Sequence, residues 1–207
     1  MIKKRDLICI IGLILIGLNV MGQPLSDREL AQKKLYTSLE EALREPDSVY
    51  RLKLNKRLKC DSLPPELFAC KNLQELYLMG TKLSVLNQAI GELENLTLLN
   101  LYHNKLVTLP ETIGQLSRLR TLIISRNLIS ILPKSIGKLQ NLTLIDAWDN
   151  PLYTLPSEIS ALQKTLKTLD LRQVALRDYE YDKMVELLPQ TNIIITSACN
   201  CNNNREK

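Results

Sequence analysis

The sequence has few of the residues on which enzymes usually depend. Among 207 residues there is one histidine, His103, and aromatic residues make up only 4%. The chain has no glycine-rich phosphate loop and no recognisable serine, histidine and aspartate arrangement. His103 and Asp149 offer a base and a carboxylate, but strand spacing predicts that they lie about 10 Å apart, with no nucleophile beside either. We therefore expect a protein without catalytic residues and without a cofactor.

Charge of one sign is also scarce. The 27 basic and 22 acidic side chains give a net charge of only +5, and they are scattered along the chain. Such a distribution excludes the basic footprint of a nucleic-acid-binding protein. Three aspartates, Asp146, Asp149 and Asp170, offer oxygen ligands for a divalent cation but lack a metal-binding loop motif. We expect a solvated acidic face rather than a metal site.

Long hydrophobic runs are absent as well. The longest uncharged apolar stretch, from Leu7 to Leu18, follows a basic start and is shorter than the roughly 20 residues that span a bilayer. This pattern is typical of a secretory signal peptide, with cleavage predicted after Gly22. An uncleaved membrane anchor is the alternative. The expected location is outside the cytoplasm: periplasm, cell surface or secreted.

Four cysteines follow the predicted signal peptide. Cys60 and Cys70 occupy apolar positions of the repeat described below, which predicts buried thiols rather than a disulfide. Cys199 and Cys201 have no nearby histidine or second cysteine pair, so a zinc site is not favoured. A local disulfide or two free thiols remain open for that pair.

The most informative feature present is a 23-residue period in the middle of the chain. Each unit reads L-x-x-L-x-L-x-x-N-x-L-x-x-L-P-x-x-I-x-x-L-x-x, and units of this length begin at Leu73, Leu96 and Leu119. Longer units of 24 residues begin at Val49 and Leu142, and an incomplete sixth follows. Such a period is typical of a solenoid, in which each coil stacks on its neighbours.

The letters of the unit have a physical explanation. In L-x-x-L-x-L, alternate side chains point inward and neighbouring coils pair as parallel strands about 4.8 Å apart. The amide of the repeated asparagine can bond backbone groups that no strand reaches, so Asn104, Asn127 and Asn150 should form a ladder. Thr81 and Val174 interrupt this ladder at its two ends. The Leu-Pro pair and the following Ile and Leu predict a return through short helical or 3₁₀ turns.

These motifs resemble the leucine-rich-repeat family. Pro110-Glu-Thr-Ile-Gly-Gln-Leu116 and Pro133-Lys-Ser-Ile-Gly-Lys-Leu139 are similar to its bacterial and Ras-suppressor-like branch. The resemblance covers about residues 49–177 and implies an α/β repeat fold. The implied fold is a right-handed solenoid of about six repeats, with short parallel strands on its concave face and helical caps. It also implies protein–protein recognition without a catalytic centre. Asn87 and Ala147 depart from the pattern, replacing a proline and a leucine.

The ends of the repeat region are expected to carry caps, which shield the core from water. Thr37 to Leu43 has a capping-box signature followed by Pro46, and therefore predicts a short helix. A helix over 178–188, with Met184, Val185 and Leu188 on one side, and a strand over 192–195 should close the other end. The predicted organisation is a signal peptide (1–22), a linker and N-terminal cap helix (23–48), repeats (49–177), a C-terminal cap (178–199) and a disordered tail (200–207). Residues 23–35, polar with scattered leucines, are expected to form a linker or a loose helix.

The repeat frame also predicts a binding surface. Positions 2, 3, 5, 7 and 8 of each unit should face solvent, which gathers several rings and charges of an aromatic-poor chain on one sheet. Arg51, Lys53 and Lys56 should make one end basic, and the three aspartates should make the other acidic. Aromatic and arginine side chains often anchor interfaces. The predicted partner-binding residues are Tyr77, Tyr102, Ile123, Arg126, Asp146, Trp148 and Arg172. The alternative is that rings lie on the strands because they fit a pleated surface.

Three functions are compatible with this surface. The favoured one is an exported, non-catalytic module that captures a protein or peptide on the concave face, and the resemblance implies a bacterial origin. A glycan-binding module, whose rings would stack on sugars, is the second. A structural or self-assembling repeat is the third. For the favoured function we expect a monomer without nucleic-acid partners and without a membrane span once the signal is cleaved.

Overall fold

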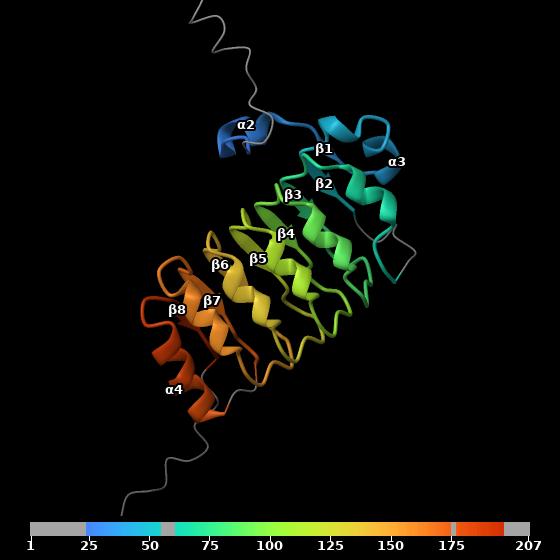
Figure 1. The fold of residues 1–207 in the computed structure, drawn as a ribbon. Helices are drawn as coiled ribbons and strands as arrows, with labels where there is room; N and C mark the ends of the chain where they lie inside the picture. The colour runs from blue at the N-terminus through green and yellow to red at the C-terminus, as the bar shows by residue number, and fades with distance from the viewer. Residues whose placement is uncertain (1–23, 55–60, 175–176, 197–207) are drawn as a thin grey trace, which may run out of the picture.

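The computed structural model describes residues 24–54, 61–174 and 177–196. Within them, eight short strands form one parallel sheet whose strands follow the order of the chain (Figure 1). The strands are β1 (Leu35–Tyr36), β2 (Arg51–Lys53), β3 (Glu75–Tyr77), β4 (Leu98–Asn100), β5 (Thr121–Ile123), β6 (Leu144–Asp146), β7 (Thr168–Asp170) and β8 (Asn192–Ile194). The predicted α/β repeat solenoid is confirmed.

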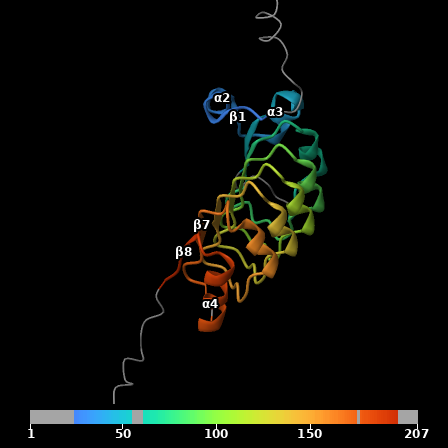
Figure 2. The ribbon, with the colours of Figure 1, turned by 60° about the vertical axis from the view of Figure 1, so that its left-hand side comes forward.

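Each coil returns through a 3₁₀ turn on the side opposite the sheet. After a short turn at the N-terminal end, η1 (Pro46–Ser48), the coil turns are η2 (Pro65–Ala69), η3 (Gln88–Glu92), η4 (Glu111–Gln115), η5 (Lys134–Lys138) and η6 (Ser157–Leu162). Figure 2 shows these turns and the strands on opposite sides of the stack, with the strands on the inner side of its curve. We call the two surfaces the turn side and the sheet face.

The core is a continuous column of leucines between the two sides. Leu76, Leu99 and Leu122 lie next to one another in the strand register, and each is fully buried. Burying such a side chain contributes about 1.5–3 kcal/mol relative to leaving it in water. Because every coil contributes the same positions, the stabilising contacts are distributed along the stack instead of meeting at one centre.

The predicted asparagine ladder is confirmed. The Asn127 amide donates to the carbonyl of Ile124 in its own coil at 2.8 Å and to that of Leu101 in the preceding coil at 3.0 Å. Its oxygen accepts the Leu106 N–H at 3.1 Å. Asn104 and Asn150 repeat this pattern one coil earlier and one coil later. The ladder thus satisfies buried backbone groups and ties each coil to the preceding one.

Glycine allows the turns to stack closely. A Cβ on Gly114 would lie 2.7 Å from the carbonyl oxygen of Ser135 in the next turn, and one on Gly137 would lie 2.2 Å from that of Glu158. Phe68 occupies the equivalent position in η2, and η2 approaches η3 less closely than the later turns approach each other. The small residue therefore sets the spacing of the inner coils on the turn side.

The two departures from the repeat pattern are accommodated locally. Asn87 stands where the other turns have proline, and its side-chain oxygen accepts the Ala89 N–H at 2.8 Å as the N-cap of η3. Ala147 replaces a leucine and is fully buried. Neither substitution interrupts the strand order.

The N-terminal end contains more structure than the sequence predicts. The predicted short helix is α3 (Leu39–Ala42), with Ser38 as its N-cap. Two further elements precede it: helix α2 (Asp27–Gln32) and strand β1, which pairs with β2. Residues 24–35 thus contain a helix, which is one of the two possibilities for this segment.

At the C-terminal end, helix α4 (Asp178–Leu187) and strand β8 lie where they are predicted. Met184 and Leu188 are buried against the core. The expectation that Val185 shares their face is wrong, because Val185 is exposed. It lies one residue beyond Met184, about 100° further round the helix.

Several predictions concern residues outside the described part of the chain. These are the signal peptide, the polar tail, Lys56 and three of the cysteines, Cys60, Cys199 and Cys201. Cys70 is a buried free thiol, as predicted, and burial raises its pKa. No helix of the described residues is both long and apolar enough to cross a membrane.

Candidate functional site

The sheet face carries side chains in lateral rows, one residue from each coil. The strand register places Tyr77, Asn100, Ile123 and Asp146 side by side at the ends of β3 to β6. A second row, two residues further along the chain, contains Met79, Tyr102, Ser125, Trp148 and Arg172. All seven predicted partner-binding residues lie in these two rows or directly after the second.

Not every side chain at the repeat positions predicted to face solvent (2, 3, 5, 7 and 8) does so, however. Gln74, Asn100, Ser125 and Asp170 were expected on the surface and are buried. Asn100 and Asp170 turn back on the chain, since each side-chain oxygen accepts the N–H two residues on, at 3.0 and 3.1 Å. Such Asx contacts end a strand locally. Ser125 donates its hydroxyl to Asp146 at 2.9 Å. These polar residues shape the face without being available to a partner.

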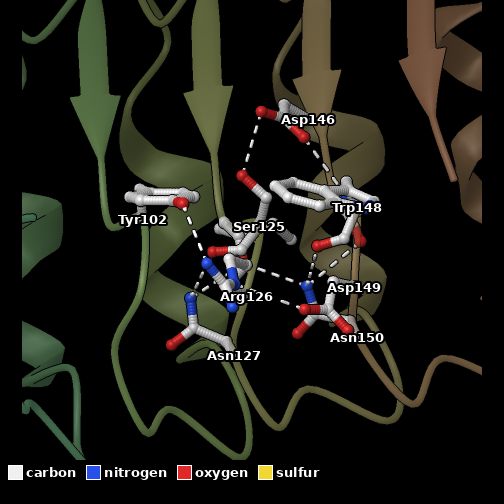
Figure 3. Close-up of polar contacts among 10 residues, drawn as sticks. Tyr102, Ser125, Arg126, Asn127, Asp146, Trp148, Asp149 and Asn150 are labelled. Atoms are coloured by element: carbon white, nitrogen blue, oxygen red, sulfur yellow. Dashed lines mark hydrogen bonds and ion pairs between the residues drawn. The ribbon is translucent and has the colours of Figure 1, made fainter. Parts of the chain in front are cut away.

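The available side chains form a row of alternating rings and guanidinium groups across four coils, of which Figure 3 shows Tyr102, Arg126 and Trp148. Arg126 donates from Nη1 to the Tyr102 hydroxyl at 3.4 Å, and its guanidinium lies 5.7 Å from the Trp148 ring centroid. On the other side, the Arg172 guanidinium lies 5.9 Å from the same centroid. Each cation–π contact of this kind contributes about 0.5–1 kcal/mol at an exposed site. We call Tyr102, Arg126, Trp148 and Arg172 the ring–arginine row.

In five coils, a residue shortly after the strand has a left-handed backbone conformation, and in one of them this residue is Arg126 of the row. Gly80, His103, Arg126, Asp149 and Gln173 all have φ between 55° and 64°. The backbone N–H of His103 donates to the Ser125 carbonyl, and that of Arg126 to the Trp148 carbonyl, one coil further on. L-residues rarely adopt this conformation, and only Gly80 signals it in the sequence. The turn was therefore not predictable at the other four coils.

The charges of the face are paired locally. Arg172 binds both oxygens of Asp170, the shortest distance being 2.7 Å, and Arg126 Nε lies 3.4 Å from Asp149. The Asp146 carboxylate accepts a hydrogen bond from the backbone N–H of Trp148 at 3.2 Å, in addition to the one from the Ser125 hydroxyl. The expected acidic end is thus largely compensated by arginines and backbone donors. Its carboxylates stabilise the row and the strand ends.

Tyr77 belongs to a separate network at the N-terminal end. Its hydroxyl donates to Glu75 at 3.1 Å, and Glu75 also accepts from Arg51 Nε at 2.6 Å. Burial and the neighbouring Glu75 carboxylate raise the pKa of the Tyr77 phenol. Arg51, one of the three side chains of the expected basic end, is thus paired with Glu75. Ile123, half-buried, lies at the end of β5 between Asn100 and Asp146.

Helix α2 borders the sheet face near the strand beginnings, which the sequence does not predict. Arg51 Nη1 lies 3.4 Å from the carbonyl oxygens of Ala31 and Lys33, and Arg120 lies 3.5 Å from Asp27. Between helix and strands lies a cleft of about 280 Å³, lined by Leu30, Leu98 and the hydroxyls of Thr97, Thr121 and Thr143 together with these charges. The signal for α2 was the capping box that Ser26 and Glu29 form.

One strand and one turn per coil, stacked in parallel, define a repeat solenoid with an open sheet face. The fold and the repeated sequence motif are those of leucine-rich-repeat proteins. The family model for the Leucine Rich Repeat matches residues 95–116 and 118–139, in the most regular coils.

The solved structures that are similar to this one include two bacterial proteins. A leucine-rich-repeat protein of Leptospira interrogans is 35% identical, with a TM-score of 0.60, over 78% of this chain and 46% of that one. The chain thus spans less than half the length of the Leptospira protein. Internalin C2 of Listeria monocytogenes is 20% identical, also with a TM-score of 0.60, over 79% of this chain and 67% of that one. A comparison with curated proteins gave no match.

Proposed function

We propose that the chain is a binding module that captures a protein or peptide on the sheet face, with the ring–arginine row as the main contact. The leucine-rich-repeat fold itself suggests an interaction module. The observation that carries the location is the Trp148 ring, held between two arginines on a solvent-accessible row. Tryptophan, tyrosine and arginine dominate the binding energy of protein interfaces.

The row is pre-organised for this purpose. Arg172 is fixed by two bonds to the buried Asp170, and Arg126 is held between Tyr102 and Asp149. Side chains that are already ordered lose less rotamer entropy when a partner binds, about 0.5–1.5 kcal/mol for each side chain. A partner would therefore meet a rigid strip of rings and donors.

The test is affinity capture with the immobilised chain from cell-surface and secreted protein extracts, followed by identification of the bound protein. Changing Trp148 and Tyr102 together to Ala should weaken the affinity for that protein at least about a hundredfold, since two anchors can each contribute about 2 kcal/mol. The fold should persist with only a modest fall in the thermal midpoint, because both rings are half-buried outside the leucine core and their loss removes the contacts to Arg126 and Arg172.

The matched control is the double change of Tyr153 and Tyr179 to Ala. Both tyrosines are 58% exposed and lie outside the row. This variant should bind as the parent does. Undiminished capture by the Trp148 and Tyr102 variant, or equal loss in the control, would contradict the assignment of the row.

The structure gives less support to glycan binding. A sugar stacks on the free face of a ring, whereas Arg126 and Arg172 both lie within 6 Å of the Trp148 centroid. A glycan array on which binding depends on Trp148 would favour that function over the proposed one.

We also propose that the protein acts outside the cytoplasm, on the strength of the basic and apolar start of the sequence. Expression with the native N-terminus, followed by cell fractionation and N-terminal sequencing, tests this. We expect an exported protein that begins at Gln23. A cytoplasmic protein that retains Met1 would contradict it.

A further inference from the structure

The last strand, β8, repeats the inward pattern of a coil, but nothing in the described residues stacks beyond it. Ile193 is in register with the fully buried Leu169, yet it is only half-buried. Ile195 follows at the position of Leu171, which is 1% exposed, whereas Ile195 is 41% exposed. Two side chains at core positions are therefore left accessible beside β8, the last strand of the sheet in Figure 1.

The backbone hydrogen-bonding groups of β8 that are paired in the described residues all face β7. The Asn192 N–H donates to Lys167 and the Ile194 carbonyl accepts from Leu171, both toward β7. Because neighbouring residues of a strand direct their backbone groups to opposite sides, the N–H and carbonyl of Ile193 point away from the sheet. Among the described strands, β8 pairs with β7 alone.

The opposite end of the sheet is protected, and β8 is not. Strand β1 has two residues, follows Lys33 and Lys34 directly and precedes α3. Short edges, lysines and covering elements are the usual means of preventing strand addition. The segment from Thr191 to Ser197 contains no charge and no proline. The remaining residues, 198–207, contain only Ala198 and two cysteines as apolar side chains, which is too little to replace a leucine coil.

We propose that β8 pairs with β8 of a second copy of this chain, antiparallel across a two-fold axis, with Ile193 and Ile195 of each copy packed together. Such a pairing is self-complementary, since each copy presents the same free donor, acceptor and isoleucines. It joins the two eight-stranded sheets into one and leaves the ring–arginine row of each copy open. The dimer is thus independent of the proposed binding function.

Light scattering and sedimentation over a wide dilution series test this pairing, under reducing conditions so that disulfide-linked species do not contribute. The wild-type mass should rise with concentration toward twice the mass of its own monomer, and its thermal midpoint should rise in parallel. Ile195→Lys places a charge in the paired edge and should raise the dimer dissociation constant at least about tenfold.

A second variant addresses the backbone. Ile193→Pro removes the N–H that points away from β7, so it should block dimerisation while the bonds to β7 remain. The control is Val107→Lys, which adds the same charge at an exposed valine of an inner coil and should leave the dimer intact. Dilute samples of all three should keep the circular dichroism of the wild type.

Three results would overturn the proposal: a wild-type monomer at every concentration, a dimer that survives both β8 variants, or a dimer that Val107→Lys disrupts equally. If one of the two β8 variants loses the circular dichroism of the folded protein, the other β8 variant alone decides whether β8 forms the dimer interface.

Discussion

The inner coils and the last coil use the same residue types with different results. Leu122 of an inner coil and Ile193 of the last strand occupy equivalent core positions, but only Leu122 is fully buried. The difference arises because Leu122 has a coil on either side and Ile193 has one on a single side. In this molecule, burial depends on stacking at least as much as on hydrophobicity.

The two ends of the stack also differ from each other. At the N-terminal end, α2, β1 and α3 extend the stack beyond the first repeat. At the C-terminal end, α4 packs its own Met184 and the adjacent Leu188 against the core, while the β8 edge stays open among the described residues. One end is therefore closed on its edge strand, and the other offers a strand for addition.

The largest expected effect comes from comparing Leu169 with Ile193 across the last pair of strands. Leu169→Ala should lower the free energy of unfolding by about 3–4 kcal/mol, because the side chain is fully buried and leaves a cavity. Ile193→Ala should cost about 1 kcal/mol, since part of its surface already meets water. Urea unfolding of dilute protein measures both. Equal losses would show that the last coil is packed like an inner one.

An intermediate effect is expected along the asparagine ladder. Asn127→Ala should destabilise by about 2–3 kcal/mol, because it leaves the buried Leu106 N–H without its acceptor. Thr81→Ala should lower the free energy of unfolding by about 1 kcal/mol or less. The Thr81 hydroxyl lies within hydrogen-bonding distance of the Leu78 carbonyl and the Asn104 side-chain oxygen, and each of these acceptors keeps another donor. Thermal and urea unfolding of the two variants, run together, give the comparison. A larger loss at Thr81 would mean that the ladder is anchored at its end.

The smallest effect concerns the turn side. Gly137→Ser should destabilise by about 2 kcal/mol, because its Cβ would overlap the Glu158 carbonyl of the next turn. Ser160 holds the equivalent position in η6, the last 3₁₀ turn of the stack, and Ser160→Gly should cost only about 0.5–1 kcal/mol through backbone entropy. Differential scanning calorimetry resolves a difference of this size. If Gly137→Ser were neutral, the turns would not limit the coil spacing.

Much of the fold could be predicted because it is periodic. The strands β2 to β7, the returns through 3₁₀ turns and the ladder of Asn104, Asn127 and Asn150 follow from one 23-residue pattern. Strand β1 and helix α2 lie outside that pattern and could not be obtained from it. The exposed Val185 marks a similar limit, because a helix of ten residues leaves its orientation to tertiary packing.

The candidate site was predictable as a set of positions but not as a set of contacts. The repeat frame places Tyr102, Trp148 and Arg172 in one row. It does not reveal that Ser125 is buried beneath Asp146, or that Arg126 is turned toward Trp148 by a left-handed backbone. These contacts join residues about one coil apart, and their geometry is fixed only when the coils stack.

The sequence by itself determined the repeat, the leucine core and the ladder, because each depends on which residue type recurs at a fixed interval. Tertiary structure alone decided which surface charges are neutralised, where α2 meets the sheet face, and that β8 ends with Ile195 exposed. The physical reason is that these features depend on what lies beside a residue in the next coil. At the last coil, the described residues place no further coil beyond β8, and Ile195 therefore stays exposed.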